Sequence, residues 1–182
     1  FLHCSGYKSN DSNYTNYFGK IYEARYLSGL AAGSLTESNK IGYVAAFPIP
    51  EVIRGINAFA NGVKEVNPNA TVEVVWTNTW FGPEEETQAA NALLEAGADV
   101  LTQHQDSAST GIAAEAAGAK WIGYHTGYGK DAAPSAFVTA PVWNWGPLYT
   151  DMVNAVINDE FTTTPYWTGM SGNVVDLFEV SD

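Results

Sequence analysis

The sequence contains a single cysteine, Cys4, among its 182 residues. One cysteine excludes an internal disulfide framework and a zinc site built from cysteines. Basic residues are also few: 8 Lys and Arg face 20 Asp and Glu, which gives a formal net charge of −12 at pH 7. Because the basic residues are scattered and form no continuous stripe, we expect no nucleic-acid partner.

Long hydrophobic runs are missing as well. The longest apolar runs, such as residues 41–50, are far shorter than the roughly 20 residues that cross a bilayer. The sequence opens without a charged and apolar targeting segment, so we expect that any such segment has been removed or lies outside this sequence. No small residue precedes Cys4, which favours a buried strand cysteine over a lipid-bearing one.

The sequence does contain ample material for one core. Hydrophobic residues make up 46% of it and aromatic residues 13%, and the length suits a single main domain. From residue 40 onward, short β-rich runs alternate with helical runs, which is typical of a parallel sheet with crossover helices. The predicted strands cover residues 40–46, 71–77, 99–102, 120–124 and 136–140, and the predicted helices cover 50–66, 83–97, a segment from an N-cap at Ser107 or Ser109 to 118, and a last helix around 148–156.

The two ends of the sequence have a different pattern. We predict a strand-like piece at residues 1–5, a polar loop at 6–13 and a helix at about 15–35. Residues 166–182 suggest a short strand pair or a tail that crosses elsewhere. The fold class expected from the whole pattern is α/β, with a Rossmann-like parallel sheet and helices on both of its faces.

Aromatic rings and planar amides gather where the predicted strands end. In an open parallel sheet the ligand lies beyond the carboxyl ends of the strands, where loops and helix N-termini converge. Rings can stack on the faces of a flat ligand, while amides and carboxylates bond to its rim. The sequence therefore predicts a binding edge for a planar, polar-edged ligand. The segments at this edge are residues 47–48, 78–81, 103–106, 124–126 and 142–145.

Catalytic patterns are weak at this edge. His104 and Asp106 lie two residues apart, so they would share one face of a continued strand, and His125 follows the neighbouring strand. No HxxxH or HExxH spacing accompanies them, so we expect neither a metal nor another cofactor. Residues 169–173 lack the final glycine of a nucleophile elbow, and we expect no catalytic residue there.

Several segments resemble the basic membrane protein family of ABC-transporter substrate-binding lipoproteins. They are residues 16–29 (NYFGKIYEARYLSG), 40–59 (KIGYVAAFPIPEVIRGINAF), 75–81 (VWTNTWF), 97–104 (GADVLTQH) and 143–146 (WNWG). The resemblance implies a type I periplasmic-binding-protein fold, in which two Rossmann-like lobes close on a ligand. This sequence resembles mainly the C-terminal lobe. We expect a hinge strand and crossover helix at 1–39, the ligand-binding lobe at 40–165 and a return crossing at 166–182.

The resemblance also implies a function. Family members bind a purine nucleoside or nucleobase, deliver it to a membrane permease and act in the periplasm or at the cell surface, held there by a lipid anchor that this sequence lacks. The family usually carries an acidic residue after the fourth strand, where this sequence has 123–127 (GYHTG), so one expected polar contact is missing. Carried over by position, the stacking candidates are Phe47 and Trp80, the rim-bonding candidates are Gln103, His104 and Asp106, and the pocket walls are Tyr124 and Trp143.

We therefore predict a non-enzymatic receptor for a purine nucleoside or nucleobase. Three alternatives stay open. One is an enzyme that uses His104 and Asp106 as acid and base on a nucleoside or sugar. The second is the effector-binding domain of a transcriptional regulator, and the third is a dimer in which a second copy replaces the missing lobe.

Overall fold

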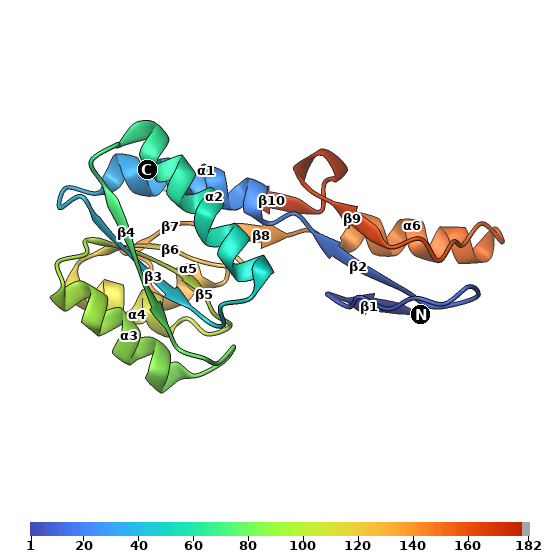
Figure 1. The fold of residues 1–182 in the computed structure, drawn as a ribbon, viewed down its shortest axis with the longest axis horizontal. Coiled ribbons are helices and arrows are strands. Elements are labelled where there is room, and N and C mark those ends of the chain that lie inside the picture. The colour runs from blue at the N-terminus through green and yellow to red at the C-terminus, as the bar shows by residue number, and fades with distance from the viewer. Residues whose placement is uncertain (180–182) are drawn as a thin grey trace.

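The computed structural model describes residues 1–179, which form a wide lobe and a narrower arm (Figure 1). The lobe is built on a five-stranded sheet whose strands are all parallel and lie in the order β4-β3-β5-β6-β7. The strands are β3 (Lys40–Ala45), β4 (Thr71–Trp76), β5 (Val100–His104), β6 (Lys120–Ile122) and β7 (Phe137–Thr139). The predicted α/β class and all five predicted strands are confirmed.

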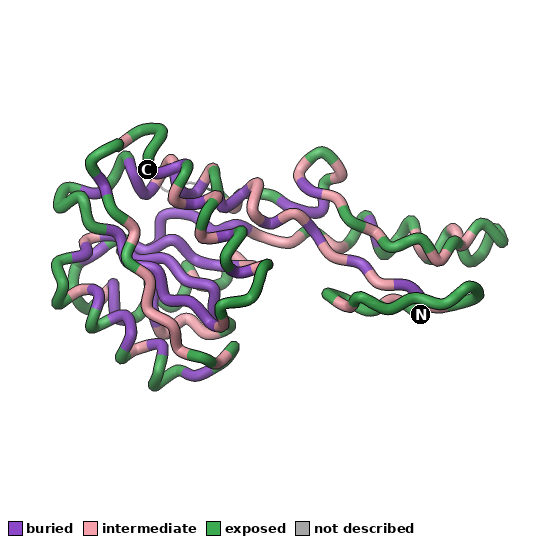
Figure 2. The backbone as a smooth tube through the Cα atoms, viewed as in Figure 1, coloured by how far each residue is buried: buried purple, intermediate pink, exposed green. Residues whose placement is uncertain are grey.

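Helices cover both faces of this sheet (Figure 1). Alternate residues of β3 point to opposite sides, so Tyr43 packs toward one pair of helices and Val44 toward the other. Both apolar layers are buried, as the purple strands at the centre of the lobe show in Figure 2. The helices are α1 (Tyr22–Leu35) and α2 (Pro50–Val66) on the first face, α3 (Pro83–Glu95) and α4 (Ser109–Ala117) on the second, and the short α5 (Gly129–Ala132).

Glycine lets α1 and α2 approach closely. A β-carbon at Gly29 would overlap the carbonyl oxygen of Phe59, and one at Gly62 would overlap the carbonyl oxygen of Tyr26. The two helices therefore pack backbone against backbone, and this contact fixes the start of α2 relative to α1.

The arm is a separate small layer of strands with one helix. Strands β1 (Leu2–Cys4), β2 (Thr15–Gly19) and β9 (Tyr166–Thr168) form a parallel sheet in the order β1-β2-β9. Helix α6 (Gly146–Ile157) packs along it, because Leu148 and Met152 join Tyr17 in one apolar cluster. Strands β8 (Pro141–Trp143) and β10 (Val175–Leu177) pair antiparallel near the junction with the lobe (Figure 1), and the 3-10 turn Met170–Gly172 lies between β9 and β10.

Several local expectations for the chain ends were wrong. Residues 15–19, predicted as the start of a helix, form β2, since side chains of alternating burial pair with a strand on each side. Cys4 lies in a strand as expected but is exposed, because β1 is the three-residue edge of the small sheet. Of the two alternatives for residues 166–182, the strand pair is wrong for the described residues 166–179, because β9 and β10 belong to different sheets. The last three residues of that segment lie outside the described residues.

Two predictions about helices need comment. Helix α4 has Ala108 as its N-cap residue, with no side-chain cap, so neither serine holds that position. Ser107 instead accepts a hydrogen bond from the backbone N–H of Ser109 (3.2 Å). The last predicted helix exists as α6 but lies in the arm, although its residues fall within the expected lobe segment 40–165. That division of the chain stays a prediction.

Candidate functional site

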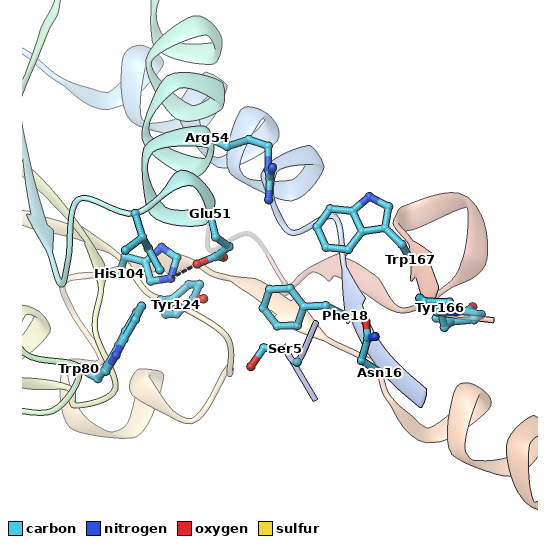
Figure 3. A pocket seen from close by; sticks show the side chains of 13 residues that line it. Ser5, Asn16, Phe18, Glu51, Arg54, Trp80, His104, Tyr124, Tyr166 and Trp167 are labelled. Carbon is cyan, nitrogen blue, oxygen red and sulfur yellow. Dashed lines mark ion pairs between the residues drawn. The ribbon is translucent and has the colours of Figure 1, made fainter. Parts of the chain in front are cut away.

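A cavity of about 550 Å³ opens between the lobe and the arm. A volume of this size suits a small organic ligand. Figure 3 shows that the side chains around it come from both parts of the molecule. The lining residues are Ser5, Gly6, Asn16, Phe18, Ile49, Glu51, Arg54, Trp80, His104, Tyr124, Pro165, Tyr166 and Trp167.

The lobe wall of the cavity is made by the carboxyl ends of parallel strands. Trp80 follows β4, His104 ends β5 and Tyr124 follows β6. The loop of Trp80 is held in place because its carbonyl oxygen accepts a hydrogen bond from the backbone N–H of Asp106 (2.9 Å). The ring of Trp80 lies 5.3 Å from that of Phe47 and 6.0 Å from that of His104, measured between centroids. The predicted binding edge is therefore a continuous aromatic wall.

Helix α2 brings charge to the same wall. Pro50 opens the helix, and Glu51 stands in its first turn, where the helix dipole favours a carboxylate. The Oε2 atom of Glu51 lies 3.2 Å from Nε2 of His104. One turn further along, the guanidinium of Arg54 lies 5.3 Å from the ring centroid of Trp167, on the opposite wall. Figure 3 shows Glu51 and Arg54 facing the arm.

The arm wall is aromatic too. Phe18 of β2 lies 6.1 Å from Trp167 of β9 and 5.0 Å from Trp143 of β8, between ring centroids. Asn16 of β2 and Tyr166 of β9 line the cavity beside them (Figure 3). The cavity therefore has rings on both sides and a few polar groups between them, which is the combination that suits a flat ligand with a polar rim.

Burial sets the protonation of the groups below the cavity. Burial lowers the pKa of His104; the hydrogen bond with Glu51 opposes this shift, and the charge of Arg25 adds to it. Burial likewise raises the pKa of the Tyr124 hydroxyl well above its usual value. Both side chains are therefore neutral at neutral pH, and the charges around the cavity floor belong to Glu51 and Arg25.

The seven predicted site residues do not all lie at the main cavity. Trp80, His104 and Tyr124 line the cavity, and Phe47 packs against Trp80. Asp106 lies 3.5 Å from Nε2 of His125, beside a smaller cavity of about 200 Å³ that Gln103 and Tyr124 also line. The side chain of Gln103 bonds within the protein, and Trp143 contacts Phe18 rather than the cavity itself. Their contacts with a ligand remain a prediction.

Sequence reasoning missed the residues that the arm supplies and the polar groups of α2. Glu51 stands at the start of the helix that follows the first strand of the lobe, and this position places it at the same edge as the strand ends. The aromatic pair Tyr166 and Trp167 lies in the segment predicted as a return crossing, for which the sequence predicts no ligand contact. A tryptophan beside a tyrosine in an otherwise polar segment was the available signal.

Among residues 1–179, no helix combines the length and the apolar character needed to cross a membrane. Nor do three or more His, Cys, Asp or Glu side chains gather there in an arrangement that could hold a metal ion.

The full chain, residues 1–182, matches the family model described as ABC transporter substrate-binding protein PnrA-like. It is 43% identical over 179 residues to a Haloferax volcanii protein named as an ABC transporter glucose-binding protein, covering 98% of this chain and 45% of that one. It is 38% identical over 177 residues to a purine-binding protein of Brucella abortus, covering 97% of this chain and 50% of that one. The chain thus spans about half the length of these two relatives.

A solved structure supports the same fold. The chain superimposes on a solute-binding protein of an ABC transporter system from Conexibacter woesei with a TM-score of 0.80 at 22% identity. The match covers 100% of this chain and 61% of that one. At this level of identity the likeness shows the shared periplasmic-binding-protein fold alone.

Proposed function

Since the chain belongs to the PnrA-like family of ABC transporter substrate-binding proteins, we propose that its cavity binds a purine nucleoside or nucleobase for delivery to a membrane permease. Binding would take place in the periplasm or at the cell surface, where substrate-binding proteins of this kind act. The proposal involves no covalent chemistry: the ligand is captured and released unchanged.

One observation carries the proposal: rings face the cavity from both walls. Trp80 and Tyr124 stand on the lobe side, while Phe18 and Trp167 stand on the arm side. Trp80 is 39% exposed and therefore has a free surface on which a base can stack. A purine presents two apolar faces and a rim of donors and acceptors. The rings of both walls can stack on its faces, and the Glu51 carboxylate can accept a hydrogen bond from a donor on its rim.

The cavity geometry also suggests how binding would be signalled. The ligand would touch the lobe and the arm together, so it would bind more tightly when the two walls are closer. A ligand shifts a conformational equilibrium only by its difference in affinity for the two states. Contacts on both walls supply that difference, and the closed form would be the one that the permease recognises.

A sugar is the second candidate, because the Haloferax volcanii relative carries the name of a glucose-binding protein. Sugar rings also stack on tryptophan, and their hydroxyls also bond to carboxylates. The two candidates differ in the ligand, not in the site.

Native mass spectrometry of co-purified ligand, followed by calorimetric titration with adenosine, hypoxanthine and glucose, tests the proposal. We expect saturable binding of a purine compound and its recovery unchanged. Trp80→Ala should weaken this binding by about 5- to 150-fold, from the 1–3 kcal/mol that stacking of a base on a ring contributes. Phe81→Ala is the matched control, since Phe81 is the neighbouring exposed ring and does not line the cavity. Binding of glucose alone would establish the sugar alternative, and turnover of adenosine would establish an enzyme.

A further inference from the structure

A buried arginine lies below the cavity without an ion-pair partner among residues 1–179. Arg25 of α1 is fully buried, and its guanidinium carbon lies 4.3 Å from the ring centroid of Tyr124. One terminal nitrogen donates to the carbonyl oxygen of Gln103 (2.7 Å), and the other reaches the hydroxyl of Thr102 (3.5 Å). Its Nε has no hydrogen-bond partner in the protein. A buried N–H donor of this kind is costly unless something accepts from it.

His104 has a matching unused atom. Its side chain is 2% exposed, and its Nε2 lies 3.2 Å from Oε2 of Glu51. A carboxylate can only accept, so Nε2 carries the hydrogen and donates it. In the neutral ring, Nδ1 is then an acceptor, and it has no partner in the protein. The buried hydroxyl of Tyr43 is unpartnered too, and the guanidinium carbon of Arg25 lies 5.4 Å from the centroid of the Tyr43 ring.

Gly55 of α2 borders the unused atoms of both residues. The point where a side chain at Gly55 would begin lies 3.9 Å from Nε of Arg25 and 3.9 Å from Nδ1 of His104. Outside its own helical turn, no atom lies closer to that point than 3.8 Å. An unmet donor and an unmet acceptor thus face the same small space, which glycine leaves open.

We propose that a water molecule binds beside Gly55, where it accepts a hydrogen bond from Nε of Arg25 and donates one to Nδ1 of His104. This water orients the His104 ring, and His104 in turn is the positioning residue that holds Glu51 as a hydrogen-bond acceptor for the ligand. Buried waters typically make about three hydrogen bonds to otherwise unsatisfied polar groups. The chain Arg25–water–His104–Glu51 is called the relay below.

The relay defines the chemistry of the ligand, and this part rests on the proposed function. His104 donates to Oε2 of Glu51, and Oε1 of the same carboxylate is buried without a partner in the protein, so the oxygen left for a ligand is Oε2, which accepts a second hydrogen bond through its other lone pair. It can bind an N–H or O–H group of a ligand and repels an anionic one. Neutral donors such as a base N–H or a sugar hydroxyl are therefore selected over phosphorylated or carboxylate-bearing compounds at this position.

The first test needs no ligand. Nitrogen-15 NMR of the imidazole ring at neutral pH distinguishes a protonated Nε2 from a protonated Nδ1. We expect the His104 signals of the tautomer with hydrogen on Nε2 and none on Nδ1. A ring protonated on Nδ1, or on both nitrogens, would overturn the relay.

The second test uses Gly55→Ala, with Asn57→Ala on the exposed face of the same helix as the control. Alanine normally stabilises a helix interior relative to glycine, and the space at Gly55 accepts a methyl group without a clash. The relay predicts the opposite, because the methyl group takes the place of the water and leaves Arg25 and His104 without partners. We expect a lower urea midpoint for Gly55→Ala and an equal or higher one for Asn57→Ala. A stabilised Gly55→Ala protein would show that no water is needed there.

The third test addresses Glu51 with adenosine as the probe. Glutamine at position 104 keeps an amide near the place of Nε2, whereas asparagine is too short to reach Glu51. We expect His104→Asn and Glu51→Gln to weaken adenosine binding by about tenfold or more, and His104→Gln to stay within about threefold of the unmodified chain. Equal losses in both His104 variants would contradict a positioning role. If adenosine does not bind the unmodified chain, the proposed function fails, while the two ligand-free tests still decide the relay.

Discussion

Replacing Gln103 by leucine should lower the stability of the protein and leave ligand affinity almost unchanged. The sequence predicted Gln103 as a rim-bonding residue of the site, but the structure gives its amide three partners inside the protein. Its Nε2 donates to the carbonyl oxygens of Gln105 (3.1 Å) and Ser107, and its Oε1 accepts from Nε1 of Trp121 (3.2 Å). Leucine has a similar volume and can replace none of these bonds.

The size of the stability loss follows from the polar groups that lose Gln103 as their hydrogen-bond partner. Trp121 is 2% exposed, so its indole N–H would remain buried without an acceptor, at a cost of about 1–3 kcal/mol. The two carbonyl groups lie in the loop after β5, where Gln105 is buried and Ser107 is half-buried, and each keeps a second lone pair for another donor, so we assign them about 1 kcal/mol together. The total is about 3 kcal/mol. For a chain of this length that corresponds to a fall in Tm of roughly 6–12 °C.

Urea unfolding followed by tryptophan fluorescence measures the loss, and calorimetric titration with adenosine measures affinity. Gln88→Leu is the matched control, because Gln88 lies on the exposed side of α3 and its amide reaches only Glu84, at 3.4 Å. A Gln103→Leu protein that is as stable as the unmodified chain but binds adenosine poorly would refute this reasoning. It would restore Gln103 as a ligand contact.

Three further predictions concern the lobe that carries the site. Gly29→Ala should destabilise the chain by about 1–3 kcal/mol in urea unfolding, because its methyl group overlaps the carbonyl of Phe59; unchanged stability would argue against the close helix contact. Burial raises the pKa of Asp99, but hydrogen bonds from the Thr36 hydroxyl (2.6 Å) and from two backbone N–H groups (2.7 Å each) lower it overall. Asp99→Ala should therefore cost about 2 kcal/mol at neutral pH, and this difference should shrink as acid titrates the carboxylate from about pH 4 downward. Burial lowers the pKa of His104, so below about pH 6.5 the unfolded chain takes up a proton that the folded chain resists. Stability should fall between pH 7.5 and 5.5, and His104→Gln should reduce that slope in urea titrations; an unaltered slope would exclude His104 as its source.

The lobe was predictable because its local signals agree with its tertiary structure. Helices α2 and α3 begin at Pro50 and Pro83, where the predicted helices begin, because proline followed by acidic residues favours the first turn of a helix. Buried strands of apolar and β-branched residues lie between them. The start of α1 was wrong for the opposite reason. Gly19 is the one local break between residues 15–19 and α1, and it is pairing with β1 and β9, distant in sequence, that makes these residues a strand.

The residues of the candidate site also divide into those that the sequence predicts and those that it does not. Trp80, His104 and Tyr124 were found because all strands of a parallel sheet end at one edge, so each strand end adds a residue to the same wall. Phe18 and Trp167 belong to a second sheet. Their distance from that edge depends on how the chain passes between the lobe and the arm, and local sequence patterns do not predict such a passage. Gln103 shows the converse, since a residue at the right position can have its polar groups used inside the protein.

The division of the site between two sheets has a mechanistic consequence. The lobe wall alone contains a stacking ring and the acceptor Glu51, which is enough to dock a flat ligand with a donor on its rim. The arm wall contributes Phe18 and Trp167. Under the proposed function, the lobe contacts would determine which ligand is held, and the arm contacts would determine how strongly that ligand favours closure. Affinity and closure can then change independently: a substitution in the relay below Glu51 acts on the first, and a substitution of an arm ring acts on the second.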